Sequence, residues 1–196
     1  MPNAAMPEAR IRHEYQTALA EISRRIAASL VGVAPQALPI RMYIAGGTAL
    51  HYYTGARVSK DVDAAFSRRI ALPADLDVAY RDEDGAAALL YFDRNYNDTL
   101  ALLHEDAYAD AQPLALPGVD AGVLDVRLLS PLDLAVSKLS RFASQDRDDI
   151  ASLARHGLID AGQLRQRAEE ALGGYIGDLA RLRTSIDIAC RMIGPT

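Results

Sequence analysis

The fold is decided by residues 43–66, which read YIAGGTALHYYTGARVSKDVDAAF. The apolar run 42–45 predicts a buried strand that ends at the glycine pair 46–47. Apolar and aromatic residues over 48–55 predict a short helix, and residues 61–66 predict a second strand. The order strand, glycine turn, helix and strand can place polar groups of both strands beside one turn.

The glycine pair is a candidate phosphate site. Neighbouring glycines let an anion approach the backbone closely, because no Cβ intervenes and a positive φ costs little. At a helix start, unpaired N–H groups and the positive end of the helix point into the turn. Thr48 is then a candidate N-cap, and its hydroxyl is a candidate donor to a phosphate oxygen. On its own, Gly-Gly more often marks a simple turn.

Asp61 and Asp63 are candidate metal ligands. Residues i and i+2 of a strand face the same side, about 6.6 Å apart along the chain. The two carboxylates therefore share one face, opposite Val62, and repel each other unless a cation lies between them. A hard divalent ion, Mg²⁺ or Mn²⁺, carrying nucleotide phosphates is the expected occupant. Asp-x-Asp alone is usually a solvated strand face, but this pair follows the glycine turn at the distance that one short helix needs.

Together, GGTAL, Arg57, Ser59 and the triplet Asp61-Val62-Asp63 resemble the signature of the nucleotidyltransferase superfamily with the polymerase-β-like core. The sequence is similar in particular to the minimal, AbiE-toxin-like bacterial nucleotidyltransferases. The resemblance implies an α+β fold, with a small mixed β-sheet flanked by helices and a C-terminal helical part. It implies metal ligands at Asp61 and Asp63, and nucleotide-binding groups at Gly46, Gly47, Thr48, Arg57 and Ser59. It extends through residues 129–153 and says little about the rest.

The resemblance also implies a third metal-facing carboxylate on a neighbouring strand. Glu105 and Asp106 are the first candidates, and Asp125 in the predicted strand 123–129 is an alternative. His104 is a candidate proton acceptor because its unperturbed pKa lies near neutrality. A histidine without a chemical role is the more frequent case.

A basic edge is predicted on the helix that begins after Ser130. This serine can cap the helix and Pro131 suits its first position, so the sequence predicts a helix through Phe142. Lys138 is either a surface lysine whose stem lies along apolar side chains or, as the resemblance implies, a catalytic group that binds nucleotide phosphates. Arg141 lies one turn further and extends the same edge.

Asp146 and Asp149 form an acidic pair, three residues apart and therefore on one helix face. They are either acids that stabilise a helix N-terminus or, as the resemblance implies, a pair that orients Lys138 or Arg141 or contacts the acceptor. Gln145 stands where the related toxins commonly show arginine, which is a departure from the toxin pattern.

The remaining patterns predict strands and helices around this motif. We expect extended segments over 70–73, 76–80, 88–92 and 99–103, with a hairpin turn at Asp84-Gly85. We expect amphipathic helices over 8–30, 161–172 and 175–192 after a loose tail, residues 1–7. The chain then divides into a core with its N-terminal helix, residues 1–129, and a helical part, residues 130–196, packed as one compact unit.

Composition limits the classes of protein. Half of the 196 residues are hydrophobic, and the net charge of −5 argues against broad, non-specific nucleic-acid binding. A single cysteine, Cys190, excludes an intramolecular disulfide and a cysteine-rich zinc site; we expect it on a buried helix face. Without an apolar run of membrane-spanning length or a secretion signal, we expect a cytoplasmic protein with no membrane partner.

The sequence therefore predicts a metal-dependent nucleotidyltransferase that moves a nucleoside monophosphate from an NTP to an acceptor hydroxyl of RNA, protein or a small molecule. A toxin–antitoxin role, with an antitoxin as partner, is the finer prediction. The alternative is a catalytically weak or inactive module of the same fold that binds or regulates. A phosphate-binding regulator that takes no nucleotide is a third hypothesis.

Overall fold

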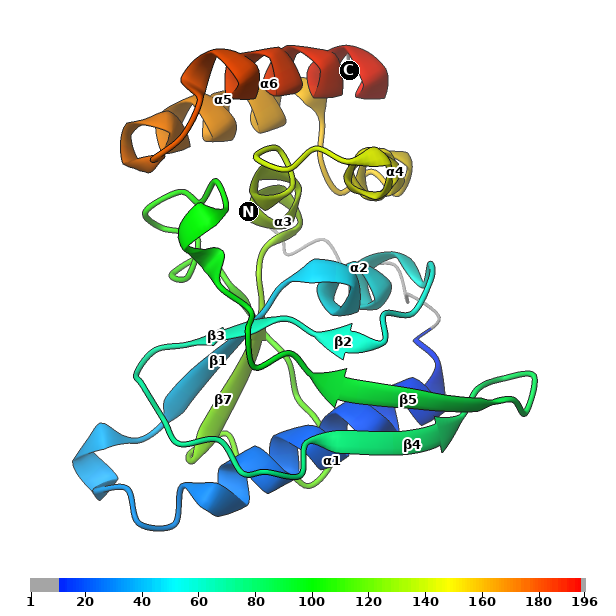
Figure 1. Cartoon of the computed structure of the whole chain (residues 1–196), viewed down its shortest axis with the longest axis vertical. Helices are drawn as coiled ribbons and strands as arrows, with labels where there is room; N and C mark the ends of the chain where they lie inside the picture. The colour runs from blue at the N-terminus through cyan, green and yellow to red at the C-terminus, as the bar shows by residue number, and fades with distance from the viewer. Residues whose placement is uncertain (1–10, 195–196) are drawn as a thin grey trace, which may run out of the picture.

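The structure is a computed structural model that describes residues 11–194. Its strands form two small mixed sheets between helices, so the predicted α+β fold is confirmed (Figure 1). The predicted tail, residues 1–7, and the first residues of the predicted N-terminal helix lie outside the described residues. Among those residues, no helix combines the length and the apolar character that crossing a membrane requires.

The larger sheet has four strands. Its order is β3 (Ala64–Phe66), β1 (Ile40–Ile44), β7 (Leu124–Leu128) and β6 (Gln112–Pro113). β1 and β7 run parallel, with Met42 opposite Val126, while β3 and β6 are antiparallel to their neighbours. β1 is buried at every residue except Arg41, which explains its almost continuous apolar sequence.

The smaller sheet has three strands, ordered β2 (Asp61–Val62), β5 (Ala87–Phe92) and β4 (Asp77–Arg81). β4 and β5 form the predicted hairpin, and Gly85 in its turn has φ +76°. The predicted single strand over 61–66 is wrong, since β2 pairs in this sheet and β3 in the other. Asp63 lies between them, at the point where the chain passes from one sheet to the other.

Two predicted strands are absent from the described residues. Residues 70–73 form no strand, and the carbonyls of Pro73 and Ala74 accept hydrogen bonds from the side chain of Arg94 instead. Residues 99–103 also form no strand. The side chain of Asn97 accepts from Thr99 N at 2.9 Å and starts the 3₁₀ turn η2 (Asp98–Leu100). Such local side-chain bonds compete with sheet pairing.

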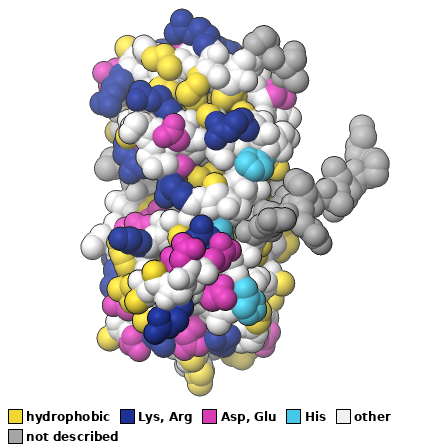
Figure 2. Space-filling view, turned by 90° about the vertical axis from the view of Figure 1, so that its right-hand side faces the viewer, with side chains coloured by type: hydrophobic (Ala, Val, Ile, Leu, Met, Phe, Trp, Pro, Cys, Tyr) yellow, Lys and Arg dark blue, Asp and Glu magenta, His cyan; other side chains and the backbone are white. Residues whose placement is uncertain are grey.

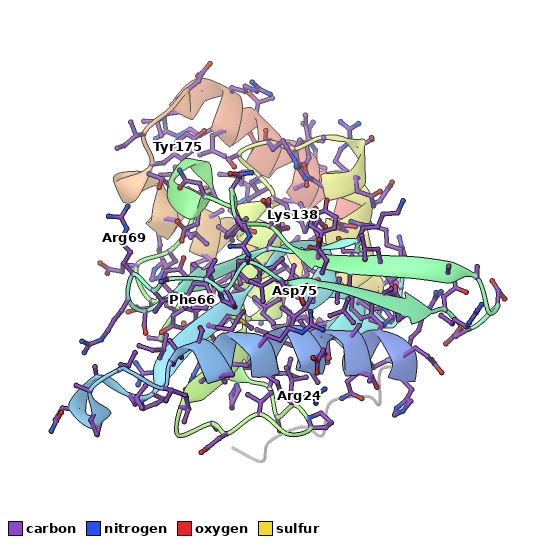
Figure 3. The ribbon with its side chains drawn as sticks, turned by 60° about the horizontal axis from the view of Figure 1, so that its bottom comes forward. Arg24, Phe66, Arg69, Asp75, Lys138 and Tyr175 are labelled. Carbon is purple, nitrogen blue, oxygen red and sulfur yellow. The ribbon has the colours of Figure 1, made fainter. Side chains whose placement is uncertain are left out.

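Helices cover the sheets on both sides. α1 (His13–Ser29) lies beneath them and buries the predicted apolar stripe, with Tyr15, Leu19, Ile22 and Ile26 fully enclosed. α2 (Gly46–Thr54) lies on the other side, over β2. Figure 3 shows α1 in front of the sheets and Lys138 behind them, on the side of α2.

The C-terminal part consists of four helices above α2: α3 (Pro131–Ser137), α4 (Ser144–Arg155), α5 (Ala161–Ala171) and α6 (Leu179–Ile193). Ser130 caps α3 as predicted, by accepting from Asp133 N at 3.0 Å. The predicted extension of α3 to Phe142 is wrong, because the helix ends at Ser137, Lys138 is its C-cap, and Phe142 has φ +49°.

The ends of the last helices follow their caps. Asp160 caps α5 as predicted. α6 begins four residues later than the pattern suggests, because Asp178 caps it, and Ile176 is 87% exposed instead of lying on the apolar stripe. Cys190 is buried on α6, as predicted. One continuous hydrophobic core includes residues from both α1 and α6; the division of the chain at residue 129 stays a prediction.

Candidate functional site

Asp63 lies directly against the glycine bend. The N–H of Ala45, which follows β1, donates to the carbonyl of Asp63 at 2.8 Å. Gly46 has φ +60°, and a Cβ added to it would lie 2.0 Å from Asp63 Oδ2. Only glycine can therefore occupy position 46 with the Asp63 carboxylate in this place. The bend and the second acid of the Asp-x-Asp pair meet, as the sequence predicts.

The prediction that Thr48 caps α2 is wrong. The helix already begins at Gly46, after Ala45. Thr48 is fully buried, and its hydroxyl donates to Asp61 O at 2.9 Å and lies 2.8 Å from the hydroxyl of Tyr15, so it is not available to a phosphate. Its backbone remains at the helix start: Ala49 makes the first intrahelical bond, to Ala45 O, which leaves the preceding N–H groups without a partner in the helix.

Asp61 lies on the same side of the chain as Asp63. The two aspartates are partly exposed, whereas Val62 and Ala64 between and after them are buried. The hydroxyl of Ser59 donates to Asp61 Oδ1. Ser59 also packs against the second glycine, since a Cβ on Gly47 would lie 2.9 Å from Ser59 Oγ. The same Cβ would lie 3.1 Å from Arg57 Nη1, so the predicted groups of this connector gather around the bend.

The structure adds a carboxylate that the sequence analysis missed. Asp93 follows β5, which pairs in parallel with β2, and its N–H donates to Val62 O at 3.1 Å. Burial, together with the negative charges of Asp61 and Asp93, raises the pKa of Asp63 to about 6. The only signal in the sequence is that Asp93 ends the apolar run 87–92; the parallel pairing that brings it to Asp63 is long-range.

The predicted candidates for a third acid lie elsewhere. Glu105 and Asp106 are exposed in a turn. Asp125 pairs with Arg127 at 2.8 Å and stands opposite Arg41, near the start of β1, whereas the glycine bend follows the end of that strand. Asp93, and none of these three acids, contributes a negative charge that raises the pKa of Asp63, so the third metal ligand stays a prediction with Asp93 as a further candidate.

His104, the candidate proton acceptor, does not line the cavity at the glycine bend. Its Nε2 lies 3.5 Å from Glu170 on α5, and its Nδ1 lies 3.8 Å from Asp106. Its contacts are therefore with the C-terminal helices and its own turn.

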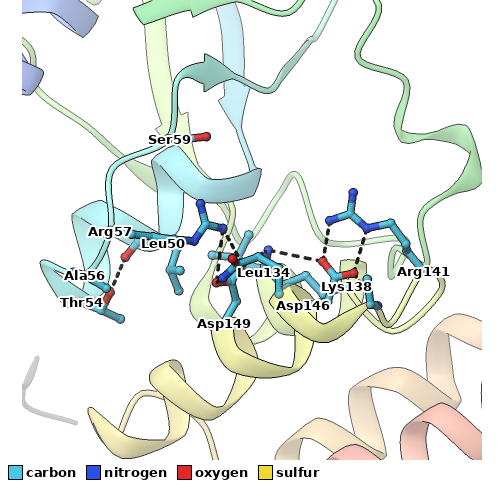
Figure 4. A network of polar contacts seen from close by, with 12 residues as sticks. Leu50, Thr54, Ala56, Arg57, Ser59, Leu134, Lys138, Arg141, Asp146 and Asp149 are labelled. Carbon is cyan, nitrogen blue, oxygen red and sulfur yellow. Dashed lines mark hydrogen bonds and ion pairs between the residues drawn. The ribbon is translucent and has the colours of Figure 1, made fainter. Parts of the chain in front are cut away.

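Lys138 and Arg57 share one buried carboxylate (Figure 4). Lys138 is 7% exposed, and its Nζ donates to Asp149 Oδ2 at 2.7 Å. Arg57 Nη2 donates to the same oxygen at 3.1 Å. Gln145 Nε2 donates to Asp149 Oδ1 at 3.0 Å, so the glutamine that departs from the toxin pattern still serves as a donor to this acid.

Arg141 is held by the other member of the acidic pair. Its guanidinium donates to both oxygens of Asp146, at 2.7 and 2.8 Å, and Asp146 is almost completely buried. Burial alone would raise the pKa of Asp146, but the bonds from Arg141 and from Ala143 N lower it overall. The acidic pair thus orients both Lys138 and Arg141, while the side chain of Arg141 remains 73% exposed.

These groups meet at a cavity of about 230 Å³. The strands and the glycine bend contribute Gly46 and Asp63, the segment after β5 contributes Tyr96 and Asn97, and the connection between α3 and α4 contributes Lys138 and Arg141. A larger cavity of about 420 Å³ lies between α1 and β4, away from these groups. The smaller cavity is the candidate site, because it joins carboxylates, cations and a helix start.

The donor set fits a hard divalent ion that arrives with a ligand. Within residues 11–194, no three acidic, histidine or cysteine side chains are grouped closely enough to enclose an ion by themselves. Mg²⁺, however, is usually bound by one or two carboxylates together with waters and substrate phosphates. Neither Asp61 nor Asp63 forms an ion pair among the described residues. Burial and the neighbouring acids raise the pKa of Asp63 although the positive charges of Lys138 and Arg141 act in the opposite direction.

Replacing Gly46 with alanine is expected to destabilise the protein by about 1–3 kcal/mol, because a side chain is strained at φ +60° and its Cβ would clash with Asp63. Urea denaturation of the metal-free protein measures this change. Gly173→Ala is the control, since a Cβ there meets nothing within 4 Å. Equal stability of the two variants would contradict the described position of Asp63.

Comparison with known protein families gives a match to a family model. The sequence model of the family described as "Nucleotidyltransferase of unknown function (DUF6036)" matches residues 21–178, which include both sheets and the acidic pair. A search of curated proteins found no match.

Proposed function

Because the chain belongs to this family of nucleotidyltransferases of unknown function, we propose that it is a metal-dependent enzyme. It transfers a nucleoside monophosphate from an NTP to an acceptor hydroxyl. One observation carries the proposal: the carboxylate of Asp63 lies against the bend at Gly46, and both line one cavity with Lys138 and Arg141.

The triphosphate binds to the glycine bend and to the cations. The free N–H groups at the start of α2 suit an anion, as does the positive end of the helix. Lys138, Arg141 and Arg57 supply positive charge, and the buried acids Asp146 and Asp149 hold these cations in place before the ligand arrives. Little reorganisation is then needed when phosphate charge develops.

Asp61 and Asp63, with Asp93 as a neighbouring carboxylate, would hold Mg²⁺ or Mn²⁺ together with the substrate phosphates, and the ion when bound would neutralise charge on the phosphate oxygens. Asp63 faces the bend, so the same place holds the phosphate next to the carboxylates. The acceptor oxygen forms a bond to the α-phosphorus as the bond to pyrophosphate breaks, and the hydroxyl proton passes to water. Lys138 and Arg141 stabilise the charge on the leaving pyrophosphate. Positioning and electrostatics supply most of the catalysis in such reactions.

RNA, protein and small molecules all remain candidate acceptors. Figure 2 shows one face of the protein on which acidic, basic and hydrophobic side chains are interspersed.

We extend the proposal to a toxin of the AbiE-like kind, with an antitoxin as partner, on the strength of the sequence signature. The hydrogen bond from Gln145 to Asp149 supports this extension, because it keeps a donor where those toxins have arginine.

Labelled nucleotides test the transfer. The protein is incubated with cell extract, Mg²⁺ and each NTP carrying label either on the α- or on the γ-phosphate. We expect label from the α-position to enter an acceptor, label from the γ-position to leave as pyrophosphate, and EDTA to stop both. Transfer of the γ-label, or transfer that persists in EDTA, would contradict the proposed reaction.

A binding or regulatory module of the same fold is the second candidate function. It is favoured by the closed ion pairs of Lys138 and Arg141, which neutralise the cations in the absence of a ligand. Thermal stabilisation by NTP with Mg²⁺, combined with no detectable transfer to any acceptor, would support this candidate. Stabilisation that survives both EDTA and Asp63→Ala would indicate binding without the metal site.

A further inference from the structure

The segment after β5 forms one wall of the cavity. This segment has no role in the reaction described above. Tyr96 and Asn97 line the cavity there. The segment begins at Asp93, whose Oδ1 accepts from Asn95 N at 2.8 Å, and it continues into η2. It is therefore fixed at its start to one of the carboxylates of the site.

The far end of this wall is also anchored. The hydroxyl of Tyr108 donates to Asp98, within η2. The ring of Tyr108 stacks on that of Tyr43 in β1, with 4.4 Å between the ring centroids. Because β1 also leads into the glycine bend, the wall and the bend are held by the same strand. Tyr96 and Asn97 thus have a fixed position relative to Asp63.

Both side chains carry a hydrogen-bond donor that no described residue uses. The hydroxyl of Tyr96 makes no hydrogen bond within residues 11–194. A tyrosine hydroxyl carries its proton at neutral pH and can therefore donate a hydrogen bond. Asn97 Oδ1 accepts from Thr99 N and from the Thr99 hydroxyl, which leaves the amide NH₂ as the free end.

The residues that line the cavity are of two chemical kinds, and they suit different parts of a nucleotide. Gly46, Lys138 and Arg141 suit the anionic triphosphate, whereas Tyr96 and Asn97 offer an aromatic ring and neutral donors. In a nucleoside triphosphate the sugar is joined directly to the α-phosphate, which lies at the carboxylates in the proposed reaction. A donor beside Asp63 therefore meets the sugar before it meets the base.

We propose that Tyr96 and Asn97 bind the sugar of the nucleotide and select ribonucleoside over 2′-deoxyribonucleoside triphosphates. The Tyr96 hydroxyl and the Asn97 amide donate to the ribose hydroxyl oxygens. The inference rests on the proposed function, since it places the triphosphate at Lys138 and Arg141. A site that hydrogen-bonds a substrate hydroxyl discriminates against the analogue that lacks it.

Calorimetric binding in Mg²⁺ tests this assignment. The four NTPs are titrated into the protein, followed by the 2′-deoxy form of the tightest one and by inorganic tripolyphosphate. We expect the deoxynucleotide to bind about tenfold more weakly, as the loss of a hydrogen bond predicts. Tyr96→Phe should bring the two affinities to within about threefold of each other, and Asn97→Ala should also reduce the difference.

Two controls distinguish sugar binding by Tyr96 from a purely structural role of this residue: tripolyphosphate as a ligand, and the same substitution at another tyrosine. Tripolyphosphate has no sugar, so Tyr96→Phe should leave its affinity unchanged. Tyr91→Phe, at a partly exposed tyrosine on β5, should change neither the affinities nor their ratio.

Each outcome decides one of the two claims. A wild-type protein that binds neither NTP nor tripolyphosphate overturns the proposed function, and the sugar assignment with it. If the wild type binds NTP and its deoxy form equally, or if Tyr96→Phe leaves their ratio unchanged, the sugar assignment alone is overturned.

Discussion

The Asp63→Asn variant is expected to lose nucleotidyl transfer by at least about a thousandfold. A bound metal supplies several kcal/mol of transition-state stabilisation, and each 1.36 kcal/mol corresponds to about a factor of ten in rate. The amide retains the shape of the carboxylate but removes its charge. Rates of label transfer from an α-labelled NTP measure the loss.

Asp84→Asn is the control for this loss of transfer. Asp84 is an exposed aspartate in the turn between β4 and β5, and its replacement should leave the rate unchanged. Transfer by Asp63→Asn within tenfold of the wild-type rate would exclude Asp63 as a metal ligand.

Asp63→Asn should also stabilise the metal-free protein at neutral pH. The pKa of Asp63 is raised to about 6, so the folded state disfavours the charged carboxylate relative to the unfolded chain. The free energy of unfolding of the wild type is therefore greatest at pH values at which Asp63 is protonated in both the folded and the unfolded state. Part of this free energy is lost as the pH rises through 6. At pH 7 we expect Asp63→Asn to be more stable by about 2 kcal/mol.

Urea denaturation in EDTA at several pH values measures this difference in the free energy of unfolding. The difference between Asp63→Asn and wild type should shrink as the pH falls below 6 and vanish below the unfolded-state pKa near 3.8. A variant that is less stable than wild type at pH 7 would show that the Asp63 carboxylate is compensated in the folded protein.

Replacing Asp149 with alanine has the largest expected effect on stability, a loss of about 3–5 kcal/mol. Asp149 and Lys138 are 3% and 7% exposed, so removing the acid leaves a buried cation whose remaining acidic neighbour, Asp146, lies at 4.0 Å instead of 2.7 Å. The free energy of unfolding is measured by urea denaturation. Asp148→Ala, an exposed neighbour on the same helix, should change stability by less than about 0.5 kcal/mol.

A double variant tests the cause of this loss. Adding Lys138→Met to Asp149→Ala removes the unpaired charge while keeping an unbranched side chain, and it should recover part of the lost stability. If the double variant is as unstable as Asp149→Ala, the loss does not come from the buried charge of Lys138.

The local features of the fold were predictable from sequence, because each depends on neighbouring residues. Ser130 and Pro131 start α3, Asp160 caps α5, and Gly85 turns the β4–β5 hairpin, as predicted. The predicted strand over 99–103 failed because the side chain of Asn97 bonds locally and starts a 3₁₀ turn. The predicted helix start at residue 175 is wrong because the cap at Asp178, not the apolar pattern, determines where α6 begins.

Residue spacing alone predicted the site only where its residues are close in sequence, whereas Lys138 and Arg141 were expected there because of the resemblance. Gly46 and Asp63 flank one short helix, so their spacing predicts the meeting that the structure shows. Asp93 was missed because a parallel pairing of β5 with β2 brings it to Asp63, and such a pairing leaves no local pattern. Thr48 was misassigned because its hydroxyl bonds to Asp61 O and Tyr15, contacts that depend on the packing of α1.

Metal-dependent nucleotide binding tests the central claim most directly. Calorimetric titration of each NTP is performed with Mg²⁺ and with EDTA, on wild type and on Asp61→Asn. We expect the wild type to bind NTP at least tenfold more weakly in EDTA than in Mg²⁺, and Asp61→Asn to bind equally weakly in both conditions. Two results would contradict a site built from the glycine bend and these carboxylates. One is wild-type binding that is equal with Mg²⁺ and with EDTA, and the other is metal-dependent binding that Asp61→Asn retains in full.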